Sequence, residues 1–278
     1  MHTWEDFVSG TVKAQIGVLG VANDENSSYL RGAAGAPPLI RQAFYSPSSN
    51  LWTETGIDLG GPDPFVDVGD LQPIPGIDSF TEIEAAAGCV LGHNLRLLSL
   101  GGDHAVTYSL VRAVAQHYPR LSILHFDAHP DLYDEFEGSR RSHACPFARI
   151  MEAGLAQRLV QVGIRGMNAH QRRQAECFLV EMIEMKDWRD DITLHFNTPV
   201  YVSFDMDCLD PAFAPGISHW EPGGLSTRQA LRLIQAIDAP IVAADIVEFN
   251  PQVEAQITAR VAAKVFKELA GKMLGQAA

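Results

Sequence analysis

A chain of 278 residues with 46% hydrophobic and 20% charged residues has the composition of a globular protein and not of a disordered one. No apolar stretch is long enough to span a bilayer, and the net charge of −13 argues against a nucleic-acid-binding surface. We therefore expect residues 1–278 to form one domain that has no membrane or nucleic-acid partner. The acidic balance is compatible with a small cationic substrate.

The N-terminus and the cysteines indicate a compartment. Met1–Gly10 is polar and acidic and lacks the basic start of a secretory signal. The four cysteines are widely spaced and form no CxxC pair, which fits free thiols in a reducing environment. We therefore expect a cytoplasmic protein.

Short apolar runs, typical of buried strands, alternate with helical patterns along the chain. In chain order we predict strand Ala14–Val21, helix Leu39–Tyr45, strand Phe65–Gly69, helix Ser79–Gly92, strand Arg96–Leu100, a helix that includes Ser109–His117, strand Leu121–Phe126, a helix from Phe147 to about Leu155, strand Arg158–Ile164, helix Gln171–Glu184, strand Pro199–Phe204, helix Ser226–Ala236, strand Pro240–Val247 and helix Ala255–Leu274. This alternation predicts a mostly parallel sheet of about eight strands with helices on both faces, a three-layer α/β/α fold.

Oxygen-bearing side chains precede three of these helices. Ser79, with Glu82 three residues later, has the spacing of a capping box. Asp103 follows two glycines that allow a tight turn, and Ser226 or Thr227 stands at the start of another helix. We expect these side chains to accept hydrogen bonds from the first backbone N–H groups of their helices.

Ionisable side chains gather where four of the predicted strands end. These residues are His104; Asp127, His129 and Asp131; Asp205 and Asp207; and Glu248. The carboxyl ends of parallel strands lie at one edge of the sheet, where open α/β sheets bind their ligands. The alternative, that these are unrelated solvated groups, requires four coincidences.

Six of these residues, four carboxylates and two imidazoles, have the chemistry of metal ligands. Six are too many for one ordinary ion and suit two ions that share carboxylates. Oxygen-rich ligation without thiolate favours Mn²⁺ over a structural zinc. Two adjacent ions can hold a hydroxide at neutral pH, so the pattern predicts a two-metal hydrolase and leaves its substrate open.

Four segments, GGDHAVTYS, HFDAHPDLYDEFEG, SFDMDCLDPAFAPG and ADIVEFNP, together resemble the signature motifs of the ureohydrolases, the family of arginases and agmatinases. The resemblance runs from about Ile16 to the C-terminus, and YDEFEGSRRSHACPFARIMEAG and GISHWEPGGLS look most like plant-type arginases. It implies an arginase-like fold, hydrolysis of a guanidino group to urea and an amine in arginine or polyamine metabolism, and a homo-oligomer, a trimer or hexamer.

The resemblance also implies roles for individual residues. It assigns two Mn²⁺ per chain, one held by His104, Asp127, Asp131 and Asp205 and the other by Asp127, His129, Asp205 and Asp207. It implies that a bridging hydroxide attacks the guanidinium carbon, with Asp207 among the catalytic residues. His143 matches the proton-shuttling histidine at the cleft mouth. Glu248 matches the carboxylate that receives the guanidinium, which can bind it through two N–H groups.

The substrate's other end is where the chain departs from animal arginases. Tyr133 stands where they have an asparagine, and Gly166 and Asn168 stand where they have acids. We expect Tyr133 and Asn168 to contact the substrate, in a rim made by loops at residues 23–32, 133–141 and 165–168. Arginine comes first as substrate, agmatine second, guanidino acids third, and peptidyl arginine stays open.

Two other classes of function remain open from the sequence. One is a catalytically idle relative that acts as a binding or regulatory subunit, although its ligands, His143 and Glu248 are all present. The other is a single-zinc amide hydrolase of the deacetylase type, which needs fewer ligands. Cys145 and Cys208 lie beside His143 and Asp207, but we expect both to be small buried hydrophobic residues and not reactive thiolates.

Overall fold

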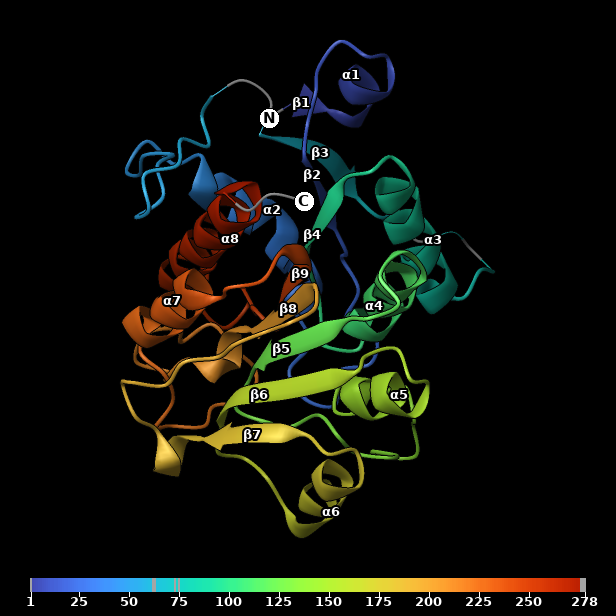
Figure 1. Ribbon diagram of the computed structural model, residues 1–278, viewed down its shortest axis with the longest axis vertical. Coiled ribbons are helices and arrows are strands. Elements are labelled where there is room, and N and C mark those ends of the chain that lie inside the picture. Colours follow the sequence, from blue (N-terminus) through green and yellow to red (C-terminus); the bar gives the residue numbers. More distant parts are fainter. Residues whose placement is uncertain (1, 62–63, 73, 75, 276–278) are drawn as a thin grey trace.

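A nine-stranded parallel sheet runs through the computed structural model, which describes residues 2–61, 64–72, 74 and 76–275 (Figure 1). In spatial order the strands are β1 (His2–Thr3), β3 (Phe65–Asp70), β2 (Ile16–Gly20), β4 (Arg96–Leu100), β9 (Ile241–Val247), β8 (Val200–Asp205), β5 (Ser122–Phe126), β6 (Arg158–Ile164) and β7 (Glu181–Glu184). Every residue of the central strands β4, β9, β8 and β5 is buried, as expected for a sheet covered on both faces.

Helices cover both faces of the sheet and give it three layers (Figure 1). One face packs against α2 (Ala36–Phe44), α7 (Thr227–Ala236) and α8 (Ile257–Gly275). The other packs against α3 (Ser79–Gly92), α4 (Val106–His117), α5 (Pro146–Glu152) and α6 (Ala169–Cys177). The remaining helical elements are α1 (Trp4–Val8) and the 3₁₀ turns η1 (Ala33–Gly35), η2 (Met185–Asp187) and η3 (Met206–Cys208). The predicted three-layer fold is confirmed.

The prediction of about eight strands is one short, and the helix predicted for Gln171–Glu184 is wrong over its second half. Helix α6 ends at Cys177, and residues 181–184 instead pair in parallel with β6 as the edge strand β7. At the opposite edge, β1 has only two residues, both exposed. Edge strands are short and half-solvated, so they lack the apolar run that reveals a buried strand.

Two of the predicted helix caps are wrong and one is confirmed. Ser79 is the first residue of α3, and the Glu82 carboxylate instead accepts the backbone N–H of Ile74 at 2.5 Å. Asp103 does not cap α4; its carboxylate accepts the backbone N–H groups of Asn26 and Ala105 and ties two loops together. Ser226 does cap α7, in a capping box with Gln229.

The strand order places the candidate site. The chain passes from β4 to β5 through α4, and the space between these two strands is filled later in the chain by β8 and β9. The four strand ends that carry ionisable residues are therefore neighbours in the sheet, at a point where ligands of α/β proteins commonly bind. Within the described residues, no helix combines the length and apolar character needed to cross a membrane.

Candidate metal centre

The imidazole of His104 lies against three carboxylates. Its Nδ1 is 3.2 Å from Asp127 Oδ2, 3.1 Å from Asp131 Oδ2 and 3.1 Å from Asp205 Oδ2. His104 follows β4, Asp127 and Asp131 follow β5, and Asp205 is the last residue of β8. The side chain of His104 is fully buried, and its Nδ1 has no hydrogen-bond partner.

Ser203 and Asp245 determine which nitrogen of His104 carries a hydrogen. Ser203 Oγ donates to Asp245 Oδ1 at 2.7 Å, so its oxygen must accept from His104 Nε2, 2.9 Å away. A neutral His104 then has its hydrogen on Nε2 and a lone pair on Nδ1. A positive charge between Nδ1 and the three carboxylates, either a proton or a metal ion, stabilises this arrangement, so it fits a metal site.

A second group of ligands joins the first through Asp127. His129 Nδ1 lies 3.0 Å from Asp207 Oδ2 and 3.5 Å from Asp127 Oδ1. Asp207 belongs to the turn η3 directly after β8, and its Oδ1 accepts the N–H of Ala128 at 3.0 Å. The structure therefore brings together all six side chains that the sequence suggested as metal ligands, from the ends of three strands.

His125 lies next to these groups but is not available to a metal. Its Nδ1 accepts a hydrogen bond from the side-chain amide of Gln161 at 2.9 Å, so its hydrogen is on Nε2. Nε2 donates to Asp127 Oδ2 at 2.7 Å, and the ring stacks on Phe147 with centroids 3.8 Å apart. Although His125 lies within reach of His104 and Asp127, it orients the Asp127 carboxylate and is not a ligand.

The electrostatics of the site call for added positive charge. Burial lowers the pKa of His104, but Asp127, Asp131 and Asp205 outweigh burial and raise this pKa well above its usual value. Burial and the neighbouring carboxylates of Asp207 and Asp127 raise the pKa of Asp205 well above its usual value. The protein's own groups thus leave the carboxylates undercompensated, as expected for residues that hold divalent cations.

Glu248 and His143 form a pair on one side of the site. Glu248 follows β9 with a φ of 61°, and its Oε1 accepts the backbone N–H of His104 at 2.9 Å and lies 3.1 Å from His143 Nδ1. The other ring nitrogen of His143 lies 2.8 Å from Ser28 Oγ. Burial lowers the pKa of His143, but the hydrogen bond and charge of Glu248 outweigh it and raise the pKa to about 9.

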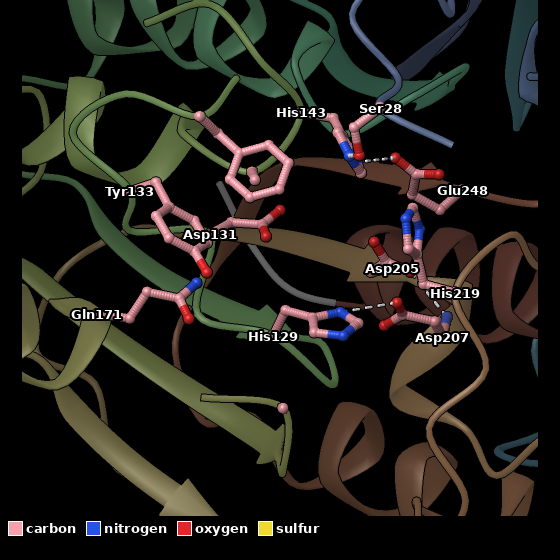
Figure 2. Close-up of a pocket in the computed structure, with 13 residues that line it drawn as sticks. Ser28, His129, Asp131, Tyr133, His143, Gln171, Asp205, Asp207, His219 and Glu248 are labelled. Atoms are coloured by element: carbon pink, nitrogen blue, oxygen red, sulfur yellow. Dashed lines mark hydrogen bonds and ion pairs between the residues drawn. The ribbon is translucent and has the colours of Figure 1, made fainter. Parts of the chain in front are cut away.

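A cavity of about 150 Å³ opens above these groups (Figure 2). One part is lined by predicted site residues: His129, Asp131, Tyr133, His143, Asp205, Asp207 and Glu248. The rest is lined by Ser28, Phe136, Ala144, Gly166, Gln171 and His219. Among the described residues, no arginine or lysine lines this cavity.

The predicted contacts with the substrate's other end divide into two groups. Tyr133 lines the cavity, whereas Asn168 lies behind it and donates from Nδ2 to the Tyr133 hydroxyl at 2.6 Å. The charged residues of the 133–141 loop do not line the cavity: Asp134 pairs with Arg140 and Arg149, and Arg141 pairs with Asp78. The charged side chains of this predicted rim loop therefore form ion pairs outside the cavity lining.

Several lining residues were not identified individually from the sequence. Ser28 lies in the 23–32 loop, which was a predicted rim, but nothing distinguished it from its neighbours. His219 reaches the cavity from the loop after β8 and stacks on His143, with ring centroids 5.1 Å apart. A lone histidine or glutamine carries no pattern, and only the fold reveals which side chains face the cavity.

Comparison with known proteins assigns the family. The model of the arginase family matches residues 14–271. The chain belongs to the arginase family. It is 47% identical to a protein named arginase 1, mitochondrial, from Arabidopsis thaliana over 95% of this chain and 82% of the relative. It is 36% identical to the N(1)-aminopropylagmatine ureohydrolase of Thermus thermophilus over 89% of this chain and 87% of the relative.

Solved structures of the arginase family share the fold. The arginase of Medicago truncatula has a TM-score of 0.89 and 44% identity, over 96% of this chain and 90% of that one. A putative agmatinase from Clostridium difficile has a TM-score of 0.83 and 28% identity, over 95% and 98% of the two chains. The predicted resemblance to arginases and agmatinases is therefore confirmed at the level of family and fold.

Proposed function

We propose that this protein is a binuclear manganese ureohydrolase that hydrolyses L-arginine to ornithine and urea. The observation that carries the proposal is the position of His104 Nδ1, which lies within 3.2 Å of carboxylate oxygens of Asp127, Asp131 and Asp205 in a buried cluster of metal-ligand side chains. The plant relatives named arginases, up to 47% identical, support arginine as the substrate.

We assign the metal ions to the six clustered side chains. His104, Asp127, Asp131 and Asp205 would hold one Mn²⁺, and Asp127, His129, Asp205 and Asp207 would hold the other. Carboxylates and imidazoles without thiolate suit manganese. When bound, such a pair of ions polarises a water molecule, so that a nucleophile forms at neutral pH.

The chain's own residues bind the substrate and handle its protons. The contacts of the Glu248 carboxylate with His104 and His143 both use Oε1, so Oε2 has no hydrogen bond to a described residue. The guanidinium would bind there and orient its carbon over the carboxylate cluster. Hydrolysis breaks the bond between that carbon and the side-chain nitrogen, and the departing amine needs a proton. His143, whose pKa of about 9 keeps it protonated at neutral pH, would supply it.

An agmatinase is the second candidate. The absence of arginine and lysine from the described cavity lining favours it, because agmatine has no carboxylate to be paired. Relatives named N(1)-aminopropylagmatine ureohydrolase and putative agmatinase are also similar to this chain. Guanidino acids and peptidyl arginine are further substrates to test.

The deciding experiment is a urea-release screen of the manganese-loaded protein. Arginine, agmatine, 4-guanidinobutyrate and a peptidyl arginine are compared by kcat/KM, since substrate discrimination is a ratio of these values. We expect arginine to be first. A preference for agmatine of more than about tenfold, roughly 1.4 kcal/mol, would make the protein an agmatinase. Absence of urea from all four, with manganese bound, would indicate an idle relative.

Metal analysis tests the assignment of the ions. We expect two manganese ions per chain in the wild-type protein and loss of both metal and turnover in Asp205→Asn. Full occupancy with undiminished turnover in that variant contradicts the ligand assignment. A single bound zinc with amide hydrolysis would instead support the deacetylase-type alternative.

Three broader features are also proposals. We propose that residues 1–278 form one domain, which the continuous sheet of the described residues supports. We propose a homo-oligomer, a trimer or hexamer, on the strength of the family resemblance. A cytoplasmic location is proposed from the sequence, and cell fractionation would test it against the mitochondrial and chloroplastic names of relatives.

A further inference from the structure

The candidate active-site cavity has two chemically different sides. Figure 2 shows Glu248 on one side and the side chains of Tyr133 and Gln171 on the other. Glu248 and the metal ligands supply carboxylate oxygens, which suit a guanidinium. Tyr133 and Gln171 carry no charge and come from different elements, the loop after β5 and the first turn of α6. This second side would therefore bind a part of the substrate other than the guanidinium.

The hydrogen of the Tyr133 hydroxyl is free to point into the cavity. Asn168 Nδ2 donates to the Tyr133 oxygen at 2.6 Å, so the hydroxyl already accepts one hydrogen bond. An N–H group cannot accept, and the hydroxyl does not donate to any other described residue. Its hydrogen is therefore available to an acceptor in the cavity that Tyr133 lines. Asn168 acts here as a positioning residue, because it does not line the cavity itself.

Gln171 offers a second donor on the same side. Its oxygen Oε1 accepts the backbone N–H of Asn168 in the capping box of α6, at 3.4 Å. This bond orients the side-chain amide and leaves Nε2 as the group that has no partner among the described residues. Gln171 is only 3% exposed and lines the cavity, so its NH₂ group borders the open space and can donate to a ligand there.

The backbone of α6 adds to this preference. Gln171 is the third residue of the nine-residue helix α6, whose N-terminal end therefore lies at this side of the cavity. The positive end of a helix dipole favours an anion. Two neutral donors and a helix N-terminus together can bind a carboxylate without an arginine or lysine.

We infer that Tyr133 and Gln171 form a subsite for the carboxylate of the substrate, and that this subsite makes the enzyme prefer arginine over its decarboxylated analogue agmatine. The inference rests on the proposed function, because it concerns the far end of a guanidino substrate whose near end binds Glu248. It also explains how a cavity without arginine or lysine in its described lining can select an amino acid.

The test exploits the double role of Gln171. Gln171→Glu keeps a carboxylate oxygen for the capping box, since Glu and Gln serve equally at this helix position. It replaces the donor NH₂ by an oxygen that repels a carboxylate. We expect kcat/KM for arginine to fall by at least about tenfold, the effect of losing one hydrogen bond to a charged group. The value for agmatine should stay the same or rise. Tyr133→Phe should also lower the ratio of kcat/KM for arginine to kcat/KM for agmatine.

Gln174→Glu is the matched control. It adds the same charge to the same helix at a residue that does not line the cavity, so both kcat/KM values should stay within about twofold of wild type. If Gln171→Glu lowered kcat/KM for both substrates equally, or left the ratio of the two values unchanged, the assignment of the carboxylate subsite would be wrong even for a protein that is a ureohydrolase.

A binding measurement separates this inference from the proposed function. Calorimetry with L-ornithine and putrescine, which differ only in the carboxylate, needs no turnover. Manganese-loaded wild type should bind ornithine more tightly, and Gln171→Glu should abolish this difference. Equal affinity of wild type for the two amines overturns the subsite. Urea release from arginine, in turn, decides the proposed function independently of that result.

Discussion

The ring of His129 lies so close to the backbone of Gly166 that a Cβ added at residue 166 would stand 2.6 Å from His129 Cδ2 and 2.9 Å from Nε2. Gly166 follows β6, and His129 follows the neighbouring strand β5. In the sequence, Gly166 was notable only because animal arginases have an acidic residue at its position. The structure gives it a different role, since it leaves space for an imidazole that points its Nδ1 at Asp207.

Gly166→Ala should therefore displace His129 and weaken metal binding. We expect the affinity for manganese to fall by about 10- to 100-fold, the usual effect of disturbing the groups that orient a metal ligand. Turnover at limiting manganese should fall with it and recover in part at saturating manganese. The measurement is manganese content after dialysis against graded free metal.

Gly88→Ala is the control for this substitution. Gly88 lies inside α3, and an added Cβ there would meet no atom within 4 Å. Because alanine is the better helix former, we expect unchanged metal content and a small gain in stability of up to about 1 kcal/mol. Normal manganese affinity in Gly166→Ala would show that His129 adapts without cost.

The metal-binding side of the cavity could be predicted from sequence because parallel topology forces it. Once apolar runs ending in His104, Asp127, Asp205 and Glu248 are recognised as strands of one parallel sheet, their ends must share one edge. The adjacent strands β4, β9, β8 and β5 bring these residues together, so the site could be predicted without knowledge of side-chain geometry.

The substrate side could not be predicted in this way because it depends on loops. Ser28 and His219 reach the cavity from loops and Gln171 from the first turn of α6, and their orientation is set by contacts made only in the folded protein. Because such contacts cannot be inferred from sequence, the charged side chains of the 133–141 loop were expected at the cavity. They form ion pairs instead: Arg140 Nη1 lies 2.5 Å from Asp134 Oδ1, and neither residue lines the cavity.

His143→Ala should keep both metal ions and lose most of the turnover. His143 contacts Glu248 and Ser28 and none of the six clustered ligands by hydrogen bond, so its loss leaves the metal groups in position. Removing a general acid typically costs about 10²- to 10⁴-fold in rate. The measurement is kcat beside manganese content.

Ser28→Ala is the matched control for the His143 variant. It removes the hydrogen bond to His143 Nε2, 2.8 Å away, but keeps the imidazole and its contact with Glu248. We expect a loss of less than about tenfold, since one neutral hydrogen bond contributes about 1 kcal/mol. Loss of manganese in His143→Ala would contradict the proposed role and make His143 a metal ligand.

Cys145 and Cys208 should be dispensable for catalysis. Both are fully buried, and neither lines the cavity. Burial, together with the neighbouring acid Asp131, raises the pKa of Cys145 to about 12, so the thiol stays protonated and is a poor nucleophile. Cys145→Ser and Cys208→Ala should keep kcat within about twofold. A large loss of turnover with manganese retained, in either variant, would mean that the thiol takes part in the reaction.

Glu54 should make stability depend on pH in the acidic range. Its carboxylate accepts from Arg228 Nη1 at 2.5 Å and Nη2 at 2.9 Å, and Lys264 Nζ lies 3.1 Å away, so it connects the 46–61 loop to α7 and α8. The hydrogen bond from Arg228 outweighs burial and lowers the pKa of Glu54 from 4.5 to about 2. Because the folded protein favours the ionised form, this stabilisation is complete above about pH 4.5 and disappears as the pH falls through about 2.

Glu54→Gln should therefore be less stable than wild type at pH 7 and equal to it near pH 2. The side chain of Glu54 is 33% exposed, so we expect a modest difference of about 1 kcal/mol, or about 2–4 °C in Tm. Thermal melts of both proteins, run in chelator so that metal release does not differ between them, would measure it at each pH. Glu176→Gln removes the same charge from the exposed side of α6, where the carboxylate makes no hydrogen bond to a described residue, and should show no such convergence. A difference between Glu54→Gln and wild type that stays constant from pH 7 to pH 2 would mean that Glu54 stabilises the fold by packing and not through its charge.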